Sequence, residues 1–226
     1  MTALDWPGCE NARDLGGLPT ASGGKIKSGA FVRTDRIRPQ GVPAVLDYGV
    51  SRVIDLRLAA TECVADPSPL AGHTVYRNVS VLRDEDTVLE DLGDGLAEMY
   101  RVILDRGAAN LARVLGVMAA APPGGVLVHC HSGKDRTGLV VALALELAGV
   151  AAQEIAADYA RTAIGLRPDP DATPRSRLLF AEITAETMLA TLEYLRAEYG
   201  GAEPYLLAGG LDPEDIGRVT ARLGAG

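Results

Sequence analysis

A short apolar run, a polar loop and a longer apolar run follow one another in the middle of the chain. Residues 126–128 read Val-Leu-Val after a Pro-Pro-Gly-Gly break, which predicts a buried strand. Residues 137–147 are apolar on nearly every side, which predicts a buried helix. The loop between them reads His-Cys-His-Ser-Gly-Lys-Asp-Arg. In open α/β sheets ligands bind beyond the carboxyl ends of the strands, so this loop is the first candidate for a binding site.

Short strands alternate with helices along the rest of the sequence. This alternation predicts an α/β fold with a mostly parallel central sheet flanked by helices on both faces. No repeat or linker interrupts the 226 residues, so we expect residues 1–226 to form a single domain. The apolar patterns predict strands at 31–33, 53–56 and 74–79, helices at 42–49, 96–103, 111–118, 188–195 and from 213, a loop or short hairpin at 11–29, and a loop at 162–174. The helix that contains 188–195 is expected to stop at Gly200, and the tyrosines at helical spacing with aliphatic residues, Tyr100, Tyr159 and Tyr194, are expected to be core side chains.

The composition limits the classes of function. A net charge of -8 argues against a general nucleic-acid binder. Cys9, Cys63 and Cys130 are too few and too irregularly spaced for a disulfide framework or a metal site, and they suit a reducing cytoplasm. We expect Cys9 and Cys63 to be small buried side chains. The chain starts without a signal-peptide pattern, and its longest apolar stretch, residues 139–148, is too short to span a bilayer. We therefore expect a cytoplasmic protein without stable membrane insertion, with secretion by a route that needs no signal peptide as the alternative.

The polar loop carries the groups needed to bind a phosphate and to attack it. Because the loop enters a helix, free backbone amides and the positive end of the helix dipole favour an anion there. The same field favours the thiolate form of Cys130, the expected nucleophile. Six positions on, the guanidinium of Arg136 can bind two phosphate oxygens at once. Gly133 permits the backbone turn. Thr137 can donate its hydroxyl to the leaving thiolate, and His129 is expected to order the loop by hydrogen bonding.

These groups predict a phosphatase reaction in two steps. The thiolate attacks phosphorus and expels the alcohol or phenol, and water then hydrolyses the phosphocysteine. A carboxylic acid has to protonate the leaving oxygen. Asp135 is nearest in the sequence, and Asp84 and Asp86 are the alternatives. A bare Cys-x5-Arg match is common by chance, but this one lies between a predicted strand and a predicted helix, which favours the functional interpretation.

The loop and two other segments resemble a known family. His-Cys, five residues and then Arg-Thr form the signature of the protein tyrosine phosphatase superfamily. More narrowly, residues 129–138 look like the HC-x-x-GKDRTG loop of atypical bacterial tyrosine/serine phosphatases. Residues 11–17, Asn-Ala-Arg-Asp-Leu-Gly-Gly, and residues 53–57 with Glu62 after them are similar to further elements of that family. Its members act on phosphotyrosine, often on phosphoserine or phosphothreonine, and some on phosphoinositides.

The resemblance implies a cysteine phosphatase fold with a helical lid over the pocket, formed by residues 87–108 or 155–195. It also implies that Asp135 is the general acid and that Lys134 widens the positive pocket. The loop residues expected to bind the phosphate are His131, Ser132, Gly133, Lys134, Asp135 and Arg136.

The amino-terminal element adds two candidates. Arg13 and Asp14 are expected to order the phosphate loop from outside, with a plain loop salt bridge as the alternative. Two positions depart from the family pattern. Ala12 stands where phenylalanine is usual, so the packing there is expected to differ. His131 stands where a smaller or apolar residue is common, and its imidazole would add positive charge near the pocket below about pH 6.5 or else face solvent.

Three functions remain open at this point. A phosphatase for phosphotyrosine proteins, with phosphoserine or phosphothreonine as further substrates, is the leading hypothesis. A phosphoinositide phosphatase is favoured by Lys134 and His131 and disfavoured by the overall acidity. A silent phosphate-binding module is disfavoured because Cys130, Asp135 and Arg136 are all present. No His/Asp/Glu cluster indicates a metal, and the chemistry requires no cofactor.

Overall fold

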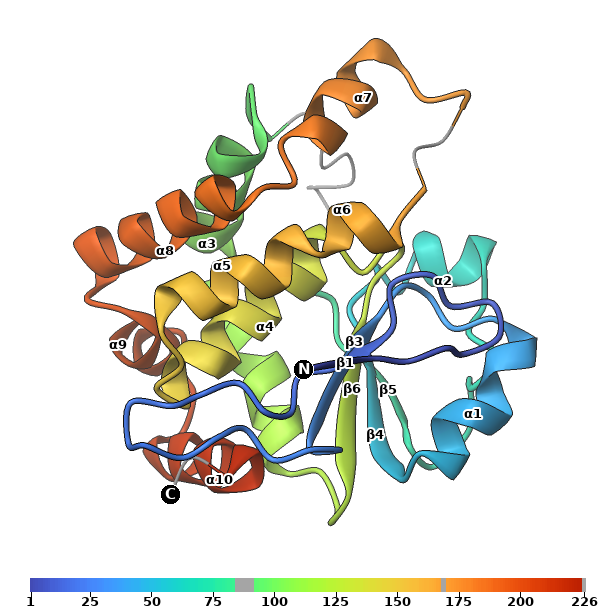
Figure 1. Ribbon diagram of the computed structural model, residues 1–226, viewed down its shortest axis with the longest axis horizontal. Helices are drawn as coiled ribbons and strands as arrows, with labels where there is room; N and C mark the ends of the chain where they lie inside the picture. Colours follow the sequence, from blue (N-terminus) through green and yellow to red (C-terminus); the bar gives the residue numbers. More distant parts are fainter. Residues whose placement is uncertain (84–91, 168–169, 225–226) are drawn as a thin grey trace.

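A mixed sheet forms the centre of the molecule. The computed structural model describes residues 1–83, 92–167 and 170–224. The strands are ordered β1-β2-β3-β6-β4-β5 (Figure 1). Strands β3, β6, β4 and β5 are parallel, and β1 and β2 add an antiparallel edge. The predicted α/β fold with a mostly parallel sheet is confirmed. The strands are β1 (Thr2–Ala3), β2 (Arg13–Asp14), β3 (Phe31–Thr34), β4 (Val50–Asp55), β5 (Tyr76–Asn78) and β6 (Gly125–His129).

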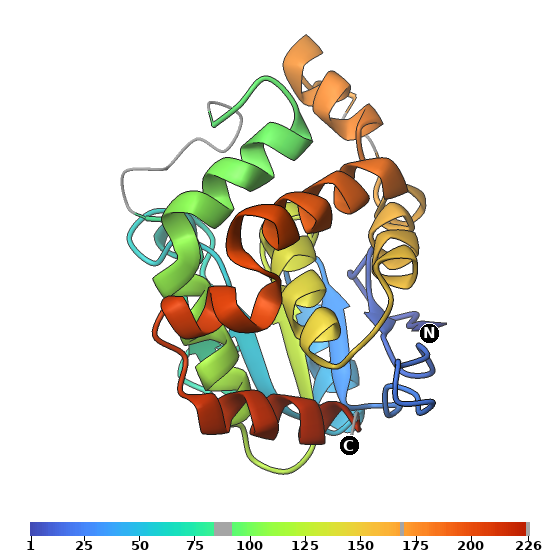
Figure 2. The same cartoon turned by 90° about the vertical axis from the view of Figure 1, so that its left-hand side faces the viewer.

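Helices cover the two faces of the sheet unequally (Figures 1 and 2). The larger layer consists of α3 (Leu96–Ala119), α4 (Asp135–Leu147), α5 (Ala152–Ala160), α8 (Ala185–Tyr199), α9 (Ala202–Ala208) and α10 (Pro213–Leu223). The other face carries the 3-10 turn Pro39–Gly41 and α1 (Val42–Asp47). Strand residues alternate between the faces, so Val126 and Val128 lie in the larger core and Leu127 in the smaller one. No helix in the described parts of the chain is long and apolar enough to cross a membrane.

The carboxyl ends of the three central strands lie level with one another. Thr34 at the end of β3 pairs in register with His129 of β6, and His129 pairs with Asp55 at the end of β4. The segments that follow these strands therefore start at the same edge of the sheet. The short helices α2 (Glu62–Ala65) and α6 (Thr162–Gly165) also lie toward this edge (Figure 1). This is the edge at which ligands bind in open α/β sheets.

The predicted helices form, but the apolar patterns did not predict α2, α5, α6 or the helix at Pro174–Ala181, and α6 lies inside the predicted loop at 162–174. Two further differences concern α3 and α9. The segments 96–103 and 111–118, predicted as separate helices, form the single helix α3. Gly107 lies inside it and is buried, so packing outweighs the low helix propensity of glycine. Helix α9 was not predicted, because Pro204 and the glycines on either side of the segment are typical of a turn. Helix α8 ends, as predicted, at Gly200, which has a φ of +80°.

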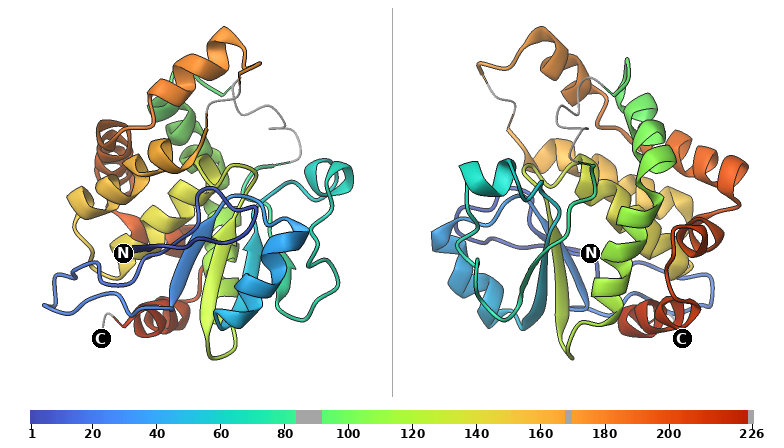
Figure 3. Two further views of the ribbon diagram at one scale, coloured as in Figure 1. Left: turned by 45° about the vertical axis from the view of Figure 1, so that its right-hand side comes forward. Right: turned by 180° about the vertical axis from the view of Figure 1, so that it is seen from behind.

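A further helix, α7 (Pro174–Ala181), stands beyond the carboxyl edge of the sheet, near the start of α3 (Figure 3). Arg175 donates hydrogen bonds to two carbonyl groups just before α3. Glu182 accepts a hydrogen bond of 2.6 Å from the first amide of α3. Both segments predicted as a lid, 155–195 and the described part of 87–108, meet in this contact. Residues 87–91 lie outside the described residues.

Candidate active site

The candidate loop connects β6 to α4 at the carboxyl edge of the sheet. Strand β6 ends at His129 and α4 begins at Asp135, so the free amides of the first turn of α4 border the loop. Gly133 has a φ of +65°, and a Cβ atom built on it would lie 2.3 Å from the carbonyl oxygen of Thr34. Any other residue would be strained there and would collide with β3. The turn that brings the loop amides together thus depends on this glycine.

Cys130 directly follows β6, is 3% exposed and carries a free thiol. Cys9 and Cys63, predicted to be buried, are only half-buried. Cys63 lies among polar groups, with its Sγ 3.8 Å from a carboxylate oxygen of Asp55. Burial raises the pKa of both thiols, and Asp55 raises that of Cys63 further. Both stay protonated at neutral pH, so Cys130, next to the start of α4, is the candidate nucleophile.

The guanidinium of Arg136 is held by the carboxylate of Glu62. In the sequence, Glu62 was noted only as part of a segment that resembles the family. The Nη1 and Nη2 atoms of Arg136 donate to the two carboxylate oxygens of Glu62 in α2, at 2.5 and 2.8 Å. Burial disfavours the charge on Arg136, but Glu62 and Cys130 raise its pKa, so the guanidinium stays charged. Among the described groups the buried Nε atom of Arg136 has no hydrogen-bond partner. This donor can bind a phosphate oxygen while Glu62 fixes the other side of the guanidinium.

Thr137 offers a second buried donor without a partner. The residue is fully buried in the first turn of α4, and its Oγ1 atom forms no hydrogen bond with any described group. A buried hydroxyl without a partner is costly, so its presence points to a group that it binds during function. Donation to the sulfur of Cys130 stays the prediction for this hydroxyl.

Asp135 begins α4, and its side chain is 13% exposed. Its Oδ1 atom accepts a hydrogen bond of 2.6 Å from the hydroxyl of Tyr100, and its Oδ2 atom lies 3.5 Å from Nζ of Lys134. The helical spacing of Tyr100 predicted a core residue. It is fully buried, but its hydroxyl also reaches the loop. The alternative acids Asp84 and Asp86 lie outside the described residues.

Two buried arginines hold the loop from behind. Arg33 donates to the carbonyl oxygen of Gly133 at 2.7 Å, and Asn11 donates to the same oxygen at 3.1 Å. The carboxylate of Asp158 binds both Arg13 and Arg33 at 2.6 Å. Arg13 also donates to the side chain of Asn11 at 2.5 Å. Arg13 thus contacts the loop only through its neighbours, and the contacts of Asn11 and Arg33 with the loop were not predicted.

Asp14 is placed differently from its predicted role. Its carboxylate accepts hydrogen bonds from the amides of Gly16 and Gly29, at 2.9 and 2.8 Å, and from the hydroxyl of Tyr48 at 3.0 Å. None of these groups belongs to the loop. Adjacent residues on a strand point to opposite sides, so Arg13 faces the loop and Asp14 turns toward the amino-terminal segment. Asp14 therefore stabilises residues 14–29 and not the phosphate loop.

Comparison with known proteins identifies the family to which the chain belongs. The model of the tyrosine phosphatase family matches residues 4–225. The chain belongs to this family. A tyrosine-protein phosphatase of Nostoc commune is 33% identical over 230 residues, covering 91% of this chain and 78% of that protein. The triple specificity protein phosphatase PtpB of Mycobacterium tuberculosis is 27% identical over 276 residues, covering 99% of both chains. The activity of the protein is accordingly that of a phosphatase.

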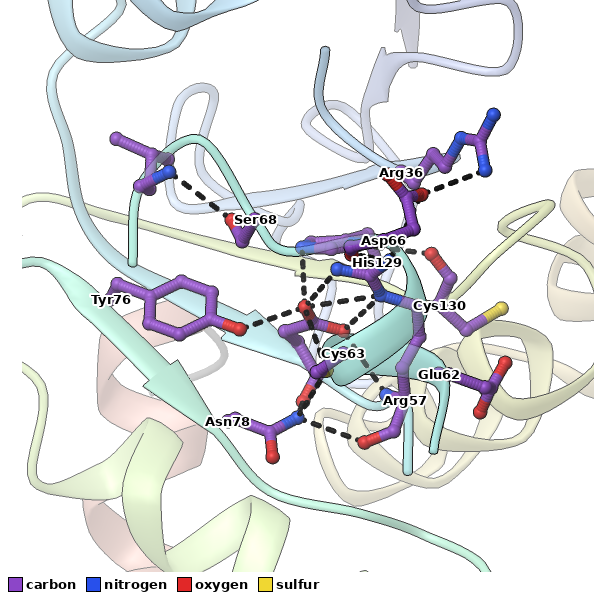
Figure 4. A network of polar contacts seen from close by, with 12 residues as sticks. Arg36, Arg57, Glu62, Cys63, Asp66, Ser68, Tyr76, Asn78, His129 and Cys130 are labelled. Atoms are coloured by element: carbon purple, nitrogen blue, oxygen red, sulfur yellow. Dashed lines mark hydrogen bonds and ion pairs between the residues drawn. The ribbon is translucent and has the colours of Figure 1, made fainter. Parts of the chain in front are cut away.

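A buried polar network lies behind Cys130, the candidate nucleophile (Figure 4). Asp55 accepts hydrogen bonds from Arg57 at 2.8 Å and from the hydroxyl of Tyr76 at 2.9 Å. Burial would raise the pKa of Asp55, but His129 and Arg57 lower it to about 2, so the carboxylate is ionised. The Nδ1 atom of His129 donates to the carbonyl oxygen of Cys130 at 3.0 Å, because a carbonyl can only accept. His129 thus contacts the backbone of the loop and has Asp55 beside it.

His131 and Arg36 lie at the edge of the phosphatase loop. The exposed His131 accepts a backbone hydrogen bond of 2.9 Å from Arg36, which forms an ion pair with Asp66 at 2.7 Å. Partial burial and the charge of Arg36 lower the pKa of His131 below its ordinary value of 6.5. Its ring is neutral at pH 7 and becomes charged at a lower pH than the sequence suggested.

Within residues 1–83, 92–167 and 170–224, no group of three His, Cys, Asp or Glu side chains could hold a metal.

Proposed function

We propose that this phosphatase hydrolyses phosphotyrosine in proteins, with phosphoserine and phosphothreonine as further substrates, through a phosphocysteine on Cys130. The observation that carries the proposal is the single loop that joins Cys130, Asp135 and Arg136, with the Nε donor of Arg136 left unpartnered among the described groups. Backbone amides from His131 to Arg136 would bind the equatorial oxygens of the phosphoryl group.

The first step transfers the phosphoryl group to sulfur. The thiolate of Cys130 attacks phosphorus, the phosphorus–oxygen bond of the substrate breaks, and Asp135 gives its proton to the leaving oxygen. Arg136 stabilises the charge on the equatorial phosphoryl oxygens, while the attacking sulfur and the leaving oxygen lie in line with phosphorus. In the second step Asp135, now ionised, takes a proton from water while the water oxygen attacks phosphorus. The sulfur of Cys130 leaves as a thiolate, to which the hydroxyl of Thr137 donates.

A phosphoinositide phosphatase is the second candidate. The relative from Mycobacterium tuberculosis is named for triple specificity, which supports a range of substrates wider than phosphotyrosine. The ammonium of Lys134 lies beside Asp135 and would favour a substrate with a second phosphate. The net charge of -8 opposes docking on an anionic bilayer, so we rank the lipid second.

Substrate preference and the covalent intermediate can be measured together. Phosphate release is compared for a phosphotyrosine peptide, a phosphoserine peptide and a soluble phosphoinositide at matched concentrations. We expect the highest kcat/KM for the phosphotyrosine peptide, and a highest value for the phosphoinositide would favour the second candidate. Acid quenching during turnover, followed by peptide mapping, is expected to find phosphate on Cys130. Phosphate bound to another side chain would contradict the mechanism.

We also propose that residues 1–226 work as one domain in a reducing cytoplasm. The family match spans residues 4–225, and the three cysteines are all free thiols in the structure, which supports both statements. Limited proteolysis is expected to give no stable fragment with activity, and fractionation of the native cells is expected to recover the protein with cytoplasmic markers.

Arg136→Lys is expected to lower kcat by about 10²–10³-fold. Lysine keeps a positive charge but loses the planar pair of donors that binds two phosphate oxygens while facing Glu62. Steady-state kinetics with an aryl phosphate measures the effect. Arg196→Lys is the matched control, because Arg196 forms an exposed ion pair with Glu146 away from the loop and its replacement should leave kcat unchanged. A kcat of Arg136→Lys close to that of wild type would contradict the clamp.

A further inference from the structure

The carboxyl group of Asp135 is held from the side of the helical layer by two tyrosines. The hydroxyl of Tyr100, in α3, lies 2.6 Å from Oδ1 of Asp135 and also 2.6 Å from the hydroxyl of Tyr159, in α5. The rings of the two tyrosines meet edge to face, with their centroids 6.0 Å apart. Tyr100 is 0% and Tyr159 is 1% exposed, so both hydroxyls are shielded from water.

The direction of these hydrogen bonds follows from the donors available. Burial and the adjacent Asp135 raise the pKa of Tyr100 well above its ordinary value, so this phenol keeps its proton. Tyr100 donates this hydrogen to Oδ1 of Asp135, which accepts it. Each phenol has one hydrogen to donate, so Tyr159 in turn donates to the oxygen of Tyr100. The two hydroxyls form a short chain that ends on a single oxygen of the acid.

We propose that Tyr100 and Tyr159 are positioning residues that hold Oδ1 of Asp135 and thereby reserve Oδ2 for the proton that is transferred to the leaving group. This inference rests on the proposed role of Asp135 as the general acid. The proton on Oδ2 moves to the leaving oxygen as the phosphorus–oxygen bond breaks, and Oδ2 later takes a proton from the attacking water. Throughout both transfers Oδ1 remains bound to Tyr100 and fixes the carboxyl plane.

The other charged groups around this chain lie on different sides of it. The ammonium of Lys134 lies 3.5 Å from Oδ2, not Oδ1, of Asp135. Arg136, in the next position, and the buried Arg33 of β3, near Tyr159, add positive charge, while Glu182, after α7, adds negative charge near Tyr159. Among the described groups, only Tyr100 donates a hydrogen bond to the carboxylate of Asp135.

A purely structural explanation is that Asp135 serves the tyrosines by satisfying their buried hydroxyls. Both explanations predict some loss of stability when Tyr100 becomes phenylalanine. Only the positioning role predicts that the loss of activity depends on the leaving group. A leaving group that departs readily as an anion needs little help from an acid, whereas a basic alkoxide or phenoxide needs the proton.

The test measures Tyr100→Phe with two substrates. For phenyl phosphate, whose leaving group is basic, kcat/KM, which reports the first step alone, is expected to fall about 10–100-fold, up to the lower end of what general acids contribute. For p-nitrophenyl phosphate it is expected to fall less than about threefold, with KM for both substrates close to wild type. Equal losses of kcat/KM on both substrates would overturn the inference.

Two further tyrosine variants make the result interpretable. Tyr159→Phe keeps the bond from Tyr100 and is expected to give the same pattern with a smaller amplitude, so it carries the test if Tyr100→Phe does not fold. Tyr205→Phe is the matched control: Tyr205 is 1% exposed and donates to the carbonyl of Leu104 at 2.7 Å, away from the loop, so the leaving-group pattern should stay that of wild type.

Asp135→Asn separates this inference from the function on which it rests. It is expected to show the same dependence on the leaving group, with a larger loss than Tyr100→Phe. If Asp135→Asn lacked that dependence, the acid would lie elsewhere and the proposed role of Asp135 would fail together with that of the tyrosines. If Asp135→Asn showed it and neither tyrosine variant did, only the positioning role would be rejected.

Discussion

Cys130→Ser is expected to lower kcat by a factor on the order of 10⁶, the scale on which a covalent hydrolase loses activity with its nucleophile. A serine hydroxyl stays protonated beside the helix dipole and is a far weaker nucleophile than a thiolate. The amides of the loop and Arg136 are left in place, so the variant should still bind inorganic phosphate. Hydrolysis of p-nitrophenyl phosphate measures the first effect, and competition or calorimetry with phosphate measures the second.

Two measurements show whether the loss of activity has a cause other than the missing nucleophile. Oxygen and sulfur differ little in volume, so the free energy of unfolding of Cys130→Ser should lie within about 1 kcal/mol of wild type. Cys9→Ser is the matched control, because Cys9 is a half-buried thiol outside the loop and its replacement should keep the wild-type kcat. Substantial residual turnover in Cys130→Ser, with the fold intact, would mean that another group attacks phosphorus.

Asp158→Asn is expected to lower the free energy of unfolding by about 3–5 kcal/mol, the cost of removing one partner from a buried ion pair. The carboxylate of Asp158 is 0% exposed and neutralises two buried guanidiniums, those of Arg13 and Arg33. An amide has the same shape but leaves both cations without a counter-charge. Because Arg33 also holds the carbonyl of Gly133, activity should fall along with stability. Denaturant titration at pH 7 measures the change.

The same carboxylate makes stability depend on pH with a defined sign. Burial opposes the charge of Asp158, but Arg33 and Arg13 lower its pKa below the ordinary value. A carboxyl group whose pKa is lower in the folded state stabilises the fold above its unfolded pKa of about 3.9, and this contribution is lost as the pH falls further. Wild type should therefore lose stability steeply below about pH 4, whereas Asp158→Asn should lose less over the same interval.

An exposed pair provides the control for this prediction. Glu214 and Arg218 lie 2.7 Å apart in α10, and their side chains are 77% and 57% exposed. Glu214→Gln should change the free energy of unfolding by less than about 1 kcal/mol, because water screens such a pair. If Asp158→Asn were no more destabilising than Glu214→Gln, the buried network would not be what holds the loop.

The sequence was most informative where neighbouring residues act together. The strand, the turn at Gly133 and the helix after Asp135 follow from local apolar patterns and from the backbone freedom of glycine. The parallel sheet follows from the alternation of strands and helices. Helix α3 was misjudged in the same terms: the apolar runs at 96–103 and 111–118 were predicted as separate helices, but buried residues on both sides of Gly107 keep the helix continuous.

Contacts between distant parts of the chain could not be predicted in this way. Glu62 reaches Arg136 across 74 positions, and Tyr100 reaches Asp135 across 35. Such pairs depend on how the elements pack, and a local pattern contains no information about that. Helical spacing identified Tyr100 correctly as a core residue but did not indicate where its hydroxyl would point. Likewise, the segment around Arg13 and Asp14 suggested a role near the loop, but only the register of β2 shows that Asp14 faces elsewhere.

The proposed nucleophile, acid and guanidinium all belong to the seven consecutive residues from Cys130 to Arg136, whereas α7 borders the same edge of the sheet from a separate part of the chain. We therefore expect the loop to determine how fast a bound phosphoester is cleaved and α7 to influence which phosphoesters enter. Exchanging α7 between relatives should change KM among phosphoesters more than it changes kcat.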